Sequence, residues 1–255
     1  MADDVLGVIW APAGQTVPDI GTKALLDVTD GDTPDIGTKA LLDVTDGDTP
    51  NIRMPVRLLS VDTPEVTANT AQRAATIDQE FVALAGWIRE GRAPVSQRWA
   101  DYILPKLDSG TAGTRQFNAG TAASAWFKDR AATRLKAPNG RQRSLFVRVA
   151  DAPFDENGRL LAYVAPSYSE RERAEMSRAE RATFNLDLVE SGWASAFVLY
   201  PSIPGEQDYP MLVRAAAEAL AEPRGQWTDQ LAMPAYEYRM CEKLHGITRR
   251  IVRGE

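Results

Sequence analysis

The stretch RLLSVDTPE, residues 57–65, combines an apolar run with charged residues at both ends. The longer run of residues 55–61, PVRLLSV, predicts a β-strand that stops at the turn-forming sequence DTP. Charged side chains at the end of a strand often line a cleft. Arg57 and Asp62 are five positions apart, so strict alternation would place them on opposite faces of the strand. For them to share a site, the chain must turn near Asp62.

Further strands and helices flank this segment. Strands are predicted at residues 144–149, 159–164 and 193–200, and the Asn-Gly pair before the second of these favours a tight turn. Apolar residues at helical spacing predict helices at residues 70–90, 95–107, 120–135, 184–191 and 211–221. Because the strands cluster around one long helical insertion, at about residues 66–116, the pattern predicts an α+β fold.

The N-terminal region contains a tandem repeat, since residues 18–33 and 34–49 both read PDIGTKALLDVTDGDT. Two copies are too few for a solenoid. One fold should need only one such strand and turn, so we expect one copy to be seated in the fold and the other to form a looser arm or an extra edge strand. We therefore predict an N-terminal arm at residues 1–35, a main domain at 36–227 and a basic C-terminal tail at 228–255.

The composition excludes several classes of catalytic site. The chain of 255 residues has one histidine, His245, one cysteine, Cys241, and a formal net charge of -6. A disulfide framework and zinc clusters of Cys and His are therefore impossible within the chain, and a Ser-His-Asp triad would have to use His245. The sequence contains no Walker-type phosphate loop. An enzyme of this composition must work with Asp, Glu, Arg, Lys or Tyr.

Nothing in the sequence points to a membrane partner. No stretch approaches the roughly 20 apolar residues that are needed to span a bilayer. The first residues lack the basic head and the apolar run of a secretory signal. We therefore expect a cytoplasmic protein, or a secreted one if a signal peptide has been removed.

Basic residues are unevenly distributed along this acidic chain. One cluster lies within residues 128–148, and a second lies near the C-terminus. The second cluster consists of Arg239, Lys243, Arg249, Arg250 and Arg253. Each cluster fits two interpretations: a surface that guides the phosphate backbone of a nucleic acid, or ordinary solvated helix faces. The residue types alone do not decide between them.

Three short patches could supply the chemistry of phosphodiester cleavage. They are residues 46–49 (DGDT), 57–65 (RLLSVDTPE) and 155–163 (DENGRLLAY). Such a reaction needs carboxylate oxygens for a hard cation, a base that takes a proton from water and bidentate donors that hold the phosphoryl oxygens. The candidates are Asp48, Asp62, Glu65, Arg57 and Arg159. Each patch alone is also typical of a turn or of a surface ion pair.

The three patches, taken together and in this order, resemble the staphylococcal nuclease (thermonuclease) family, whose pattern is D-G-D-T, then R-L-x-x-V/I-D-x-P-E, then G-R-x-L-A-Y. Residues 185–194, NLDLVESGWA, resemble the family's N-x-x-L-V-x-x-G-x-A segment, and residues 224–227, RGQW, resemble its closing segment. The resemblance covers about residues 39–65 and 117–227. It implies an OB-like five-stranded β-barrel with three core helices, to which the helical hairpin near residues 66–116 is an addition.

The resemblance also implies a function and a role for each candidate. Members of the family are calcium-dependent nucleases that cut DNA and RNA and leave 3'-phosphate ends. By this resemblance, Ca²⁺ is bound by Asp48, Asp62 and the backbone carbonyl of Thr63. Glu65 is the general base that activates water. Arg57 and Arg159 hold the phosphate and stabilise the transition state.

The repeat and two departures from the family bear on these assignments. The second copy of the repeat has the more family-like spacing, so we assign the metal-binding acid to Asp48 and not to Asp32. The family's nucleotide-stacking tyrosine is Val198 here, and the tyrosine before its Gly-Arg is Asn157. The alternative function is a catalytically inactive nuclease-fold module that binds nucleic acid or a protein partner. A twelve-residue calcium loop is not supported, because the acids near Asp48 miss its alternating register.

Overall fold

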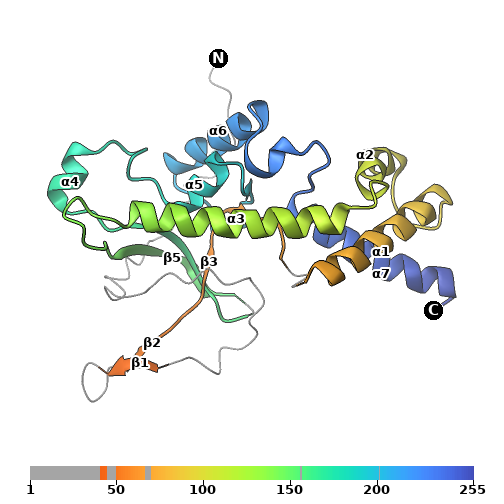
Figure 1. The fold of residues 1–255 in the computed structure, drawn as a ribbon, viewed down its shortest axis with the longest axis horizontal. Helices are drawn as coiled ribbons and strands as arrows, with labels where there is room; N and C mark the ends of the chain where they lie inside the picture. The colour runs from red at the N-terminus through yellow and green to blue at the C-terminus, as the bar shows by residue number, and fades with distance from the viewer. Residues whose placement is uncertain (1–40, 45–49, 67–69, 156, 201) are drawn as a thin grey trace. The chain divides into compact units, whose positions relative to one another are not determined.

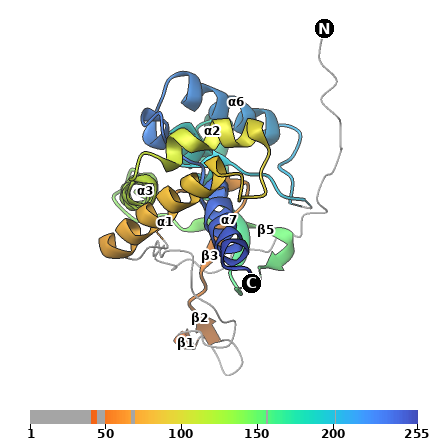
Figure 2. The same cartoon turned by 90° about the vertical axis from the view of Figure 1, so that its right-hand side faces the viewer.

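The structure is a computed structural model that describes residues 41–44, 50–66, 70–155, 157–200 and 202–255 (Figures 1 and 2). The predicted N-terminal arm, the first repeat copy and Asp48 of the second copy lie outside the described residues. The chain divides into two compact units, which are described separately. Unit 1 contains residues up to Val61, Lys128–Val189 and Ala196–Ala217, and unit 2 contains Asp62–Phe127, Glu190–Ser195 and Glu218–Glu255.

A three-stranded sheet organises unit 1 (Figure 1). Strand β6 (Leu160–Pro166) lies in the middle of this sheet. Strand β3 (Val56–Leu58) runs parallel to β6 on one side, and β5 (Leu145–Phe154) runs antiparallel to it on the other. The strands predicted at residues 55–61, 144–149 and 159–164 are thus found, although the first of them is shorter than predicted.

The central strand β6 has one buried face and one half-buried face. Leu160, Ala162 and Val164 are 8%, 0% and 1% exposed, whereas Leu161 and Tyr163 between them are half-buried. This period of two is what a strand with only one face in the core produces. The side chains on the half-buried face are therefore available for a function other than packing.

The predicted five-stranded β-barrel does not close within the described residues. β1 (Leu41–Val44) and β2 (Pro50–Ile52) pair antiparallel in a ladder of their own. Proline has no N–H to donate to a ladder, and the link from β1 to β3 contains Pro50, the first residue of β2, and Pro55, the residue before β3. This link is therefore poorly suited to extend β1 and β3 into one continuous sheet.

Two further strands are much shorter than a barrel requires. The strand predicted at residues 193–200 is reduced to β7 (Ser195–Ala196), and Leu199 forms an isolated bridge with Ser202 instead. β4 (Val61–Asp62) is equally short. The α+β fold class is confirmed, because helices and mostly antiparallel strands share the described chain.

Helices accompany the sheet of unit 1. They are α4 (Glu170–Glu175), α5 (Phe184–Glu190), most of α6 (Asp208–Ala221) and the last residues of α3 (Ala112–Arg134). The carboxylate of Asp187 in α5 accepts hydrogen bonds from Arg130 and Arg134, the latter at 2.6 Å. Because Asp187 is only 3% exposed, this ion pair ties α5 to the end of α3 within unit 1.

The carboxamide of Asn185 joins α5 to the sheet. Its Nδ2 donates to the carbonyl oxygen of Leu59 at 2.8 Å and to that of Ala162 at 3.2 Å, and its Oδ1 accepts from the backbone N–H of Val164 at 3.1 Å. Asn185 is 2% exposed, so these bonds satisfy backbone groups that water does not reach. They fix the end of β3 against β6.

The chain turns directly after β3, at Ser60. This residue has a φ of 61°, in the left-handed region that residues other than glycine seldom adopt. The backbone N–H of Leu59 still donates to Ala162, at 3.0 Å, so the turn begins where the β3–β6 ladder ends. The turn that a shared site for Arg57 and Asp62 would require therefore exists, but it lies at Ser60 and not at Pro64.

Unit 2 is built mainly from helices. α1 (Ala71–Arg89), α2 (Gln97–Leu107), the first part of α3 and α7 (Ala235–Arg253) surround one apolar cluster, and a short 3-10 helix, η1 (Gly225–Thr228), precedes α7. The cluster includes Phe81 and Leu84 of α1, Ile103 of α2 and Tyr238 of α7, all at most 1% exposed. The helices predicted at residues 70–90 and 95–107 are confirmed.

The predicted basic tail contains a packed helix. In α7, Tyr238 meets the ring of Phe81 edge-on with a centroid distance of 5.4 Å, and His245 stacks on Trp87 at 5.3 Å. The buried residues of α7 recur three or four positions apart, which is the period of a helix with one face in a core. The prediction of a tail at residues 228–255 rested on its basic residues and did not use this helical period. None of the described helices combines the length and apolarity that crossing a bilayer requires.

The Asn185 carboxamide gives a prediction for the stability of unit 1. Asn185→Ala leaves the carbonyls of Leu59 and Ala162 and the N–H of Val164 without this partner, so we expect unit 1 to lose about 2–3 kcal/mol of stability. Amide exchange of a peptide covering β6, followed by mass spectrometry, should become faster. Asn118→Ala, a change at an exposed position of α3, is the control and should leave exchange in β6 unchanged. Unchanged exchange in Asn185→Ala would contradict the assignment.

Candidate functional site

The half-buried face of the unit 1 sheet carries three arginines. In the register of the sheet, Arg57 of β3 lies beside Leu161 of β6, and Arg148 of β5 lies opposite Tyr163. Paired residues of neighbouring strands point to the same side. Arg159 is two positions before Leu161, so alternation places it on this side as well. We call the set Arg57, Arg148 and Arg159 the arginine face.

Arg159 is held by the turn that precedes β6. Its Nε donates to Oδ2 of Asp155 at 2.7 Å, and its backbone N–H donates to Oδ1 at 2.9 Å. The N–H of Asn157 also donates to this carboxylate, at 3.0 Å, and Gly158 adopts the left-handed φ of 68° that the turn needs. Asp155 therefore orients Arg159 from both its backbone and its side chain. Sequence reasoning gave no role to Asp155, although the acid four positions before the arginine was visible.

Protonation of Asp155 responds to the same contacts. Partial burial acts to raise the pKa of its carboxyl, but the hydrogen bonds and positive charge of Arg159 outweigh burial and lower the pKa below its ordinary value. The carboxylate is thus ionised, and the guanidinium stays paired, over the whole neutral range.

A tyrosine lies among the arginines. Tyr163 shares their face of the sheet, and its hydroxyl is 2.6 Å from the hydroxyl of Ser60, the residue of the turn after β3. Burial raises the pKa of Tyr163 above its ordinary value, so the phenol is neutral at physiological pH. The sequence left open whether Tyr163 and Tyr200 face the core. Tyr163 lies on the arginine face, and Tyr200 is 81% exposed.

Two of the predicted carboxylates meet in unit 2, on an arginine of α7. Arg239 donates from Nη2 to Oδ2 of Asp62 at 2.8 Å and from Nη1 to Oδ1 at 3.2 Å, and Nη1 also donates to Oε1 of Glu65. The side chains of Asp62, Glu65 and Arg239 are 1%, 18% and 35% exposed. We call these three residues the carboxylate–arginine cluster. Thr63, the predicted carbonyl ligand, lies between the two acids in sequence and is half-buried.

The charges of this cluster compensate one another. Burial alone would lower the pKa of Arg239, but the hydrogen bonds and negative charges of Asp62 and Glu65 raise it above its ordinary value. Glu242 lies three positions after Arg239 on α7. Burial and the negative charge of Glu65 raise the pKa of its carboxyl, which disfavours the charged form of this acid. The cluster therefore pairs one guanidinium with two carboxylates, and a further acid lies nearby.

The segment that carries Glu65 is fitted closely against α3. A Cβ at Gly120 would lie 2.8 Å from the carbonyl oxygen of Pro64, so only glycine allows this approach. The side chain of Gln116, one turn earlier, bridges the segment to the chain before α7: with its amide oriented to satisfy both partners, the oxygen accepts from the N–H of Glu65 at 3.0 Å and the nitrogen donates to the carbonyl of Met233 at 3.1 Å. The backbone of Glu65 is thus fixed.

The donor set of the cluster fits a hard cation only in part. Carboxylate oxygens are the ligands that Ca²⁺ takes in proteins, and Asp62 and Glu65 supply them. Among the described residues, however, no group of three or more His, Cys, Asp or Glu gathers as a metal site. Arg239 engages oxygens of both acids. The third predicted acid, Asp48, lies outside the described residues.

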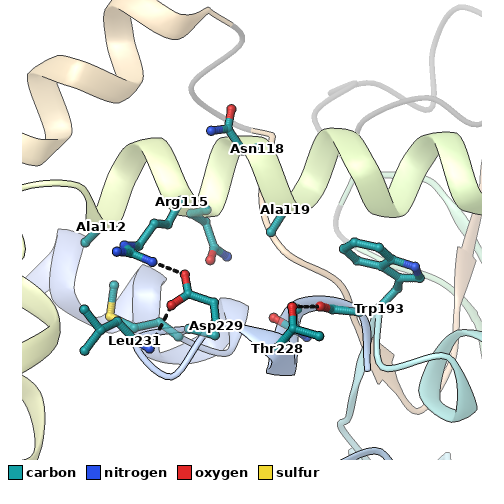
Figure 3. A pocket seen from close by; sticks show the side chains of 13 residues that line it. Ala112, Arg115, Asn118, Ala119, Trp193, Thr228, Asp229 and Leu231 are labelled. Atoms are coloured by element: carbon teal, nitrogen blue, oxygen red, sulfur yellow. Dashed lines mark hydrogen bonds and ion pairs between the residues drawn. The ribbon is translucent and has the colours of Figure 1, made fainter. Parts of the chain in front are cut away.

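A cavity of about 330 Å³ lies within unit 2, and Gln116 is one of the residues that line it (Figure 3). Its wall is formed by α3, η1, Trp193 and residues 231–233. Arg115 and Asp229 are paired on this wall. Gln226 also lines the cavity, and it is 4% exposed with no hydrogen-bond partner at Nε2 among the described groups. The cavity is lined by groups of mixed polarity, and Glu65 is not among its lining residues.

The structure thus gathers the predicted residues into two sets. Arg57 and Arg159 share the arginine face of unit 1, whereas Asp62 and Glu65 share the carboxylate–arginine cluster of unit 2. Arg239, the partner of both acids, was missed as a site residue. The helical period of the buried residues of α7 would have placed this arginine on a helix, but no local signal links it to acids that lie 174 and 177 positions away.

Comparison with known families agrees with the resemblance read from the motifs. The family model described as Staphylococcal nuclease homologue matches residues 104–229, a range that includes Arg159 and α5. It begins after Glu65 and ends before Arg239. A search of curated proteins finds no match for the chain. Residues 104–229 of the chain are therefore similar to the staphylococcal nuclease homologue family.

Proposed function

We propose that the chain is a calcium-dependent nuclease that hydrolyses phosphodiester bonds of DNA or RNA and leaves 3'-phosphate ends. The observation that carries this proposal is the arginine face, on which Arg57 and Arg159 share one side of a sheet whose central strand lies in the family segment. Two guanidinium groups on one face suit a phosphodiester, because each offers planar, paired N–H donors to phosphoryl oxygens.

Arg57 and Arg159 are proposed to bind the scissile phosphate and to stabilise the charge that builds on it in the transition state. Asp155 supports this role as a positioning residue. It accepts from Nε and from the backbone N–H of Arg159, so the guanidinium plane has a defined direction before substrate binds. A donor that is oriented in advance loses less entropy on binding.

Glu65 is proposed as the general base. It takes a proton from a water molecule, the water oxygen attacks phosphorus, and the bond from phosphorus to the 5'-oxygen breaks. The leaving 5'-oxygen takes up a proton, and the phosphate remains on the 3'-side. The backbone of Glu65 is held by Gln116 and packed on Gly120, so only the side-chain torsions of Glu65 can move its carboxylate.

Asp48, Asp62 and the backbone carbonyl of Thr63 are proposed to hold Ca²⁺. When bound there, the ion neutralises the negative charge of the phosphate and lowers the cost of attack by water. Asp62 would offer the ion a carboxylate that is only 1% exposed. The choice of Asp48 over Asp32 rests on the spacing of the repeat.

The proposal also includes a fold, domain bounds, a partner and a compartment. The family's OB-like five-stranded barrel remains a proposal, and the β3–β6–β5 sheet is the part of the described chain that supports it. The main domain at residues 36–227, with its addition near 66–116, is also a proposal. DNA or RNA is the proposed partner, and the cytoplasm is the proposed compartment.

A non-catalytic function is the second candidate. Arg239 already compensates Asp62 and Glu65, as expected of a structural ion pair in a module that binds nucleic acid or a protein without cutting it. The replacement of two stacking tyrosines by Val198 and Asn157 agrees with this alternative. Cleavage assays separate the two candidates.

The role of Glu65 is tested by Glu65→Gln, which removes the base but keeps the shape and hydrogen-bonding capacity of the side chain. Cleavage of single- and double-stranded DNA and RNA in Ca²⁺ should slow by about 100-fold or more. Glu175→Gln, at an exposed position of α4, should cleave at the wild-type rate. If the wild type leaves every substrate intact with each common divalent ion but still binds it, the non-catalytic candidate is correct.

The arginine face is tested by Arg57→Lys and Arg159→Lys, which keep the charge and remove the paired donors. We expect kcat to fall by about 100-fold for each, with a smaller change in KM, because the donors act on charge that develops in the transition state. Arg171→Lys, with a side chain 89% exposed on α4, is the matched control. Wild-type rates in both face variants would show that the face does not take part in catalysis.

The two copies of the repeat give a paired test. Asp48→Ala should abolish calcium-dependent cleavage, whereas Asp32→Ala should leave it largely intact, because the second copy has the more family-like spacing to Arg57. Initial rates are measured over a calcium titration for both variants. The reverse result would assign the metal-binding acid to the first copy.

A further inference from the structure

The carboxylate–arginine cluster contains a charged residue that the family motifs do not include. We propose that Arg239 is a built-in counter-cation, which occupies Asp62 and Glu65 in the metal-free chain and which a divalent cation must displace in order to bind these acids. This inference rests on the proposed function, because the function assigns Asp62 to a metal. It adds a residue of α7, outside the family segment, that sets the affinity for that metal.

Competition follows from the contacts of the guanidinium. Both oxygens of Asp62 accept from Arg239, at 2.8 and 3.2 Å, and Oε1 of Glu65 accepts from the same group. A hard cation takes lone pairs of these carboxylate oxygens. It would also stand close to the guanidinium, and two positive charges in a partly buried place repel each other. The cation and the arginine therefore exclude each other at these acids.

Burial explains why the acids need a counter-charge without metal. Asp62 is 1% exposed, and a buried carboxylate without a positive partner is strongly destabilising. Glu65 and Glu242 add further negative charge nearby. Arg239 places a positive charge on Asp62 and Glu65 while no cation is bound.

The Arg239 side chain can move away from Asp62 and Glu65 while α7 stays folded. Tyr238, the preceding residue, is 1% exposed and packs on Phe81, so the backbone of α7 is anchored in the core of unit 2. The Arg239 side chain itself is 35% exposed. A long side chain on a fixed helix can turn its charged end into water by changing rotamers. Displacement thus needs a side-chain rearrangement and no movement of the helix.

The experiment is calcium binding to the metal-stripped full chain, measured by titration calorimetry, which does not depend on cleavage. Arg239→Gln should bind Ca²⁺ at least 10-fold more tightly than the wild type, because no guanidinium has to be displaced. Arg239→Lys keeps the charge but not the paired donors, so its affinity should lie between the two. Arg250→Gln, at an exposed position of the same helix, should match the wild type.

Thermal stability gives a second readout on the same samples. Without metal, Arg239→Gln should melt at a lower temperature than the wild type, because Asp62 has lost the positive charge of the guanidinium. Saturating Ca²⁺ should raise the Tm of Arg239→Gln more than that of the wild type, since the ion then replaces the missing charge. Arg239→Lys keeps a positive charge beside Asp62, so it provides the same comparison if Arg239→Gln does not fold.

The outcomes separate this inference from the proposed function. Equal or weaker calcium binding by folded Arg239→Gln and Arg239→Lys overturns the role of Arg239, while calcium-dependent cleavage by the wild type would leave the proposed function standing. Tighter binding by the variants supports the inference whether or not the wild type cleaves. No calcium binding by any of the proteins overturns the inference, and cleavage is then judged from its own assay.

Discussion

The hydrogen bonds of the Asn185 carboxamide hold the segment on which the account depends. A single buried side chain satisfies the carbonyls of Leu59 and Ala162 and the N–H of Val164, at the point where β3 ends against β6. The position of Arg57 on the sheet and the direction of the chain after Ser60 both follow from this junction. The same carboxamide lies inside the family segment, as do Ala162 and Val164, whereas its third partner, Leu59, lies before that segment.

Charge compensation is the second constraint, and it recurs in each part of the molecule. Asp155 holds Arg159, Asp187 holds Arg130 and Arg134, and Arg239 holds Asp62 and Glu65. The net charge of -6 describes the whole surface and not the field near one group of side chains. Because individual acids orient individual arginines, an acidic chain can still have arginines in positions where they could contact a polyanion. The relevant quantity is the local geometry of each pair, and not the total charge.

The sequence predicted what depends on local pattern. The helices at residues 70–90 and 95–107, the strands on either side of the Asn-Gly turn, and the need for a turn between Arg57 and Asp62 were all visible from period and turn chemistry. The strand at 193–200 was predicted too long, because an apolar run does not reveal whether a partner strand continues beside it. The role of Asn185 and the partner of Glu65 depend on residues more than 100 positions away, and no local signal reports such contacts.

The proposed function makes one central chemical claim, that water attacks a phosphodiester and the bond to the 5'-oxygen breaks. The most direct test is cleavage of an end-labelled oligonucleotide by the full chain in ¹⁸O-labelled water, with Ca²⁺ and with a chelator. The account predicts calcium-dependent products whose 3'-phosphate contains one ¹⁸O atom per cut and whose other end is a 5'-hydroxyl. Products with 5'-phosphate ends, or an intact oligonucleotide under every condition, would contradict it.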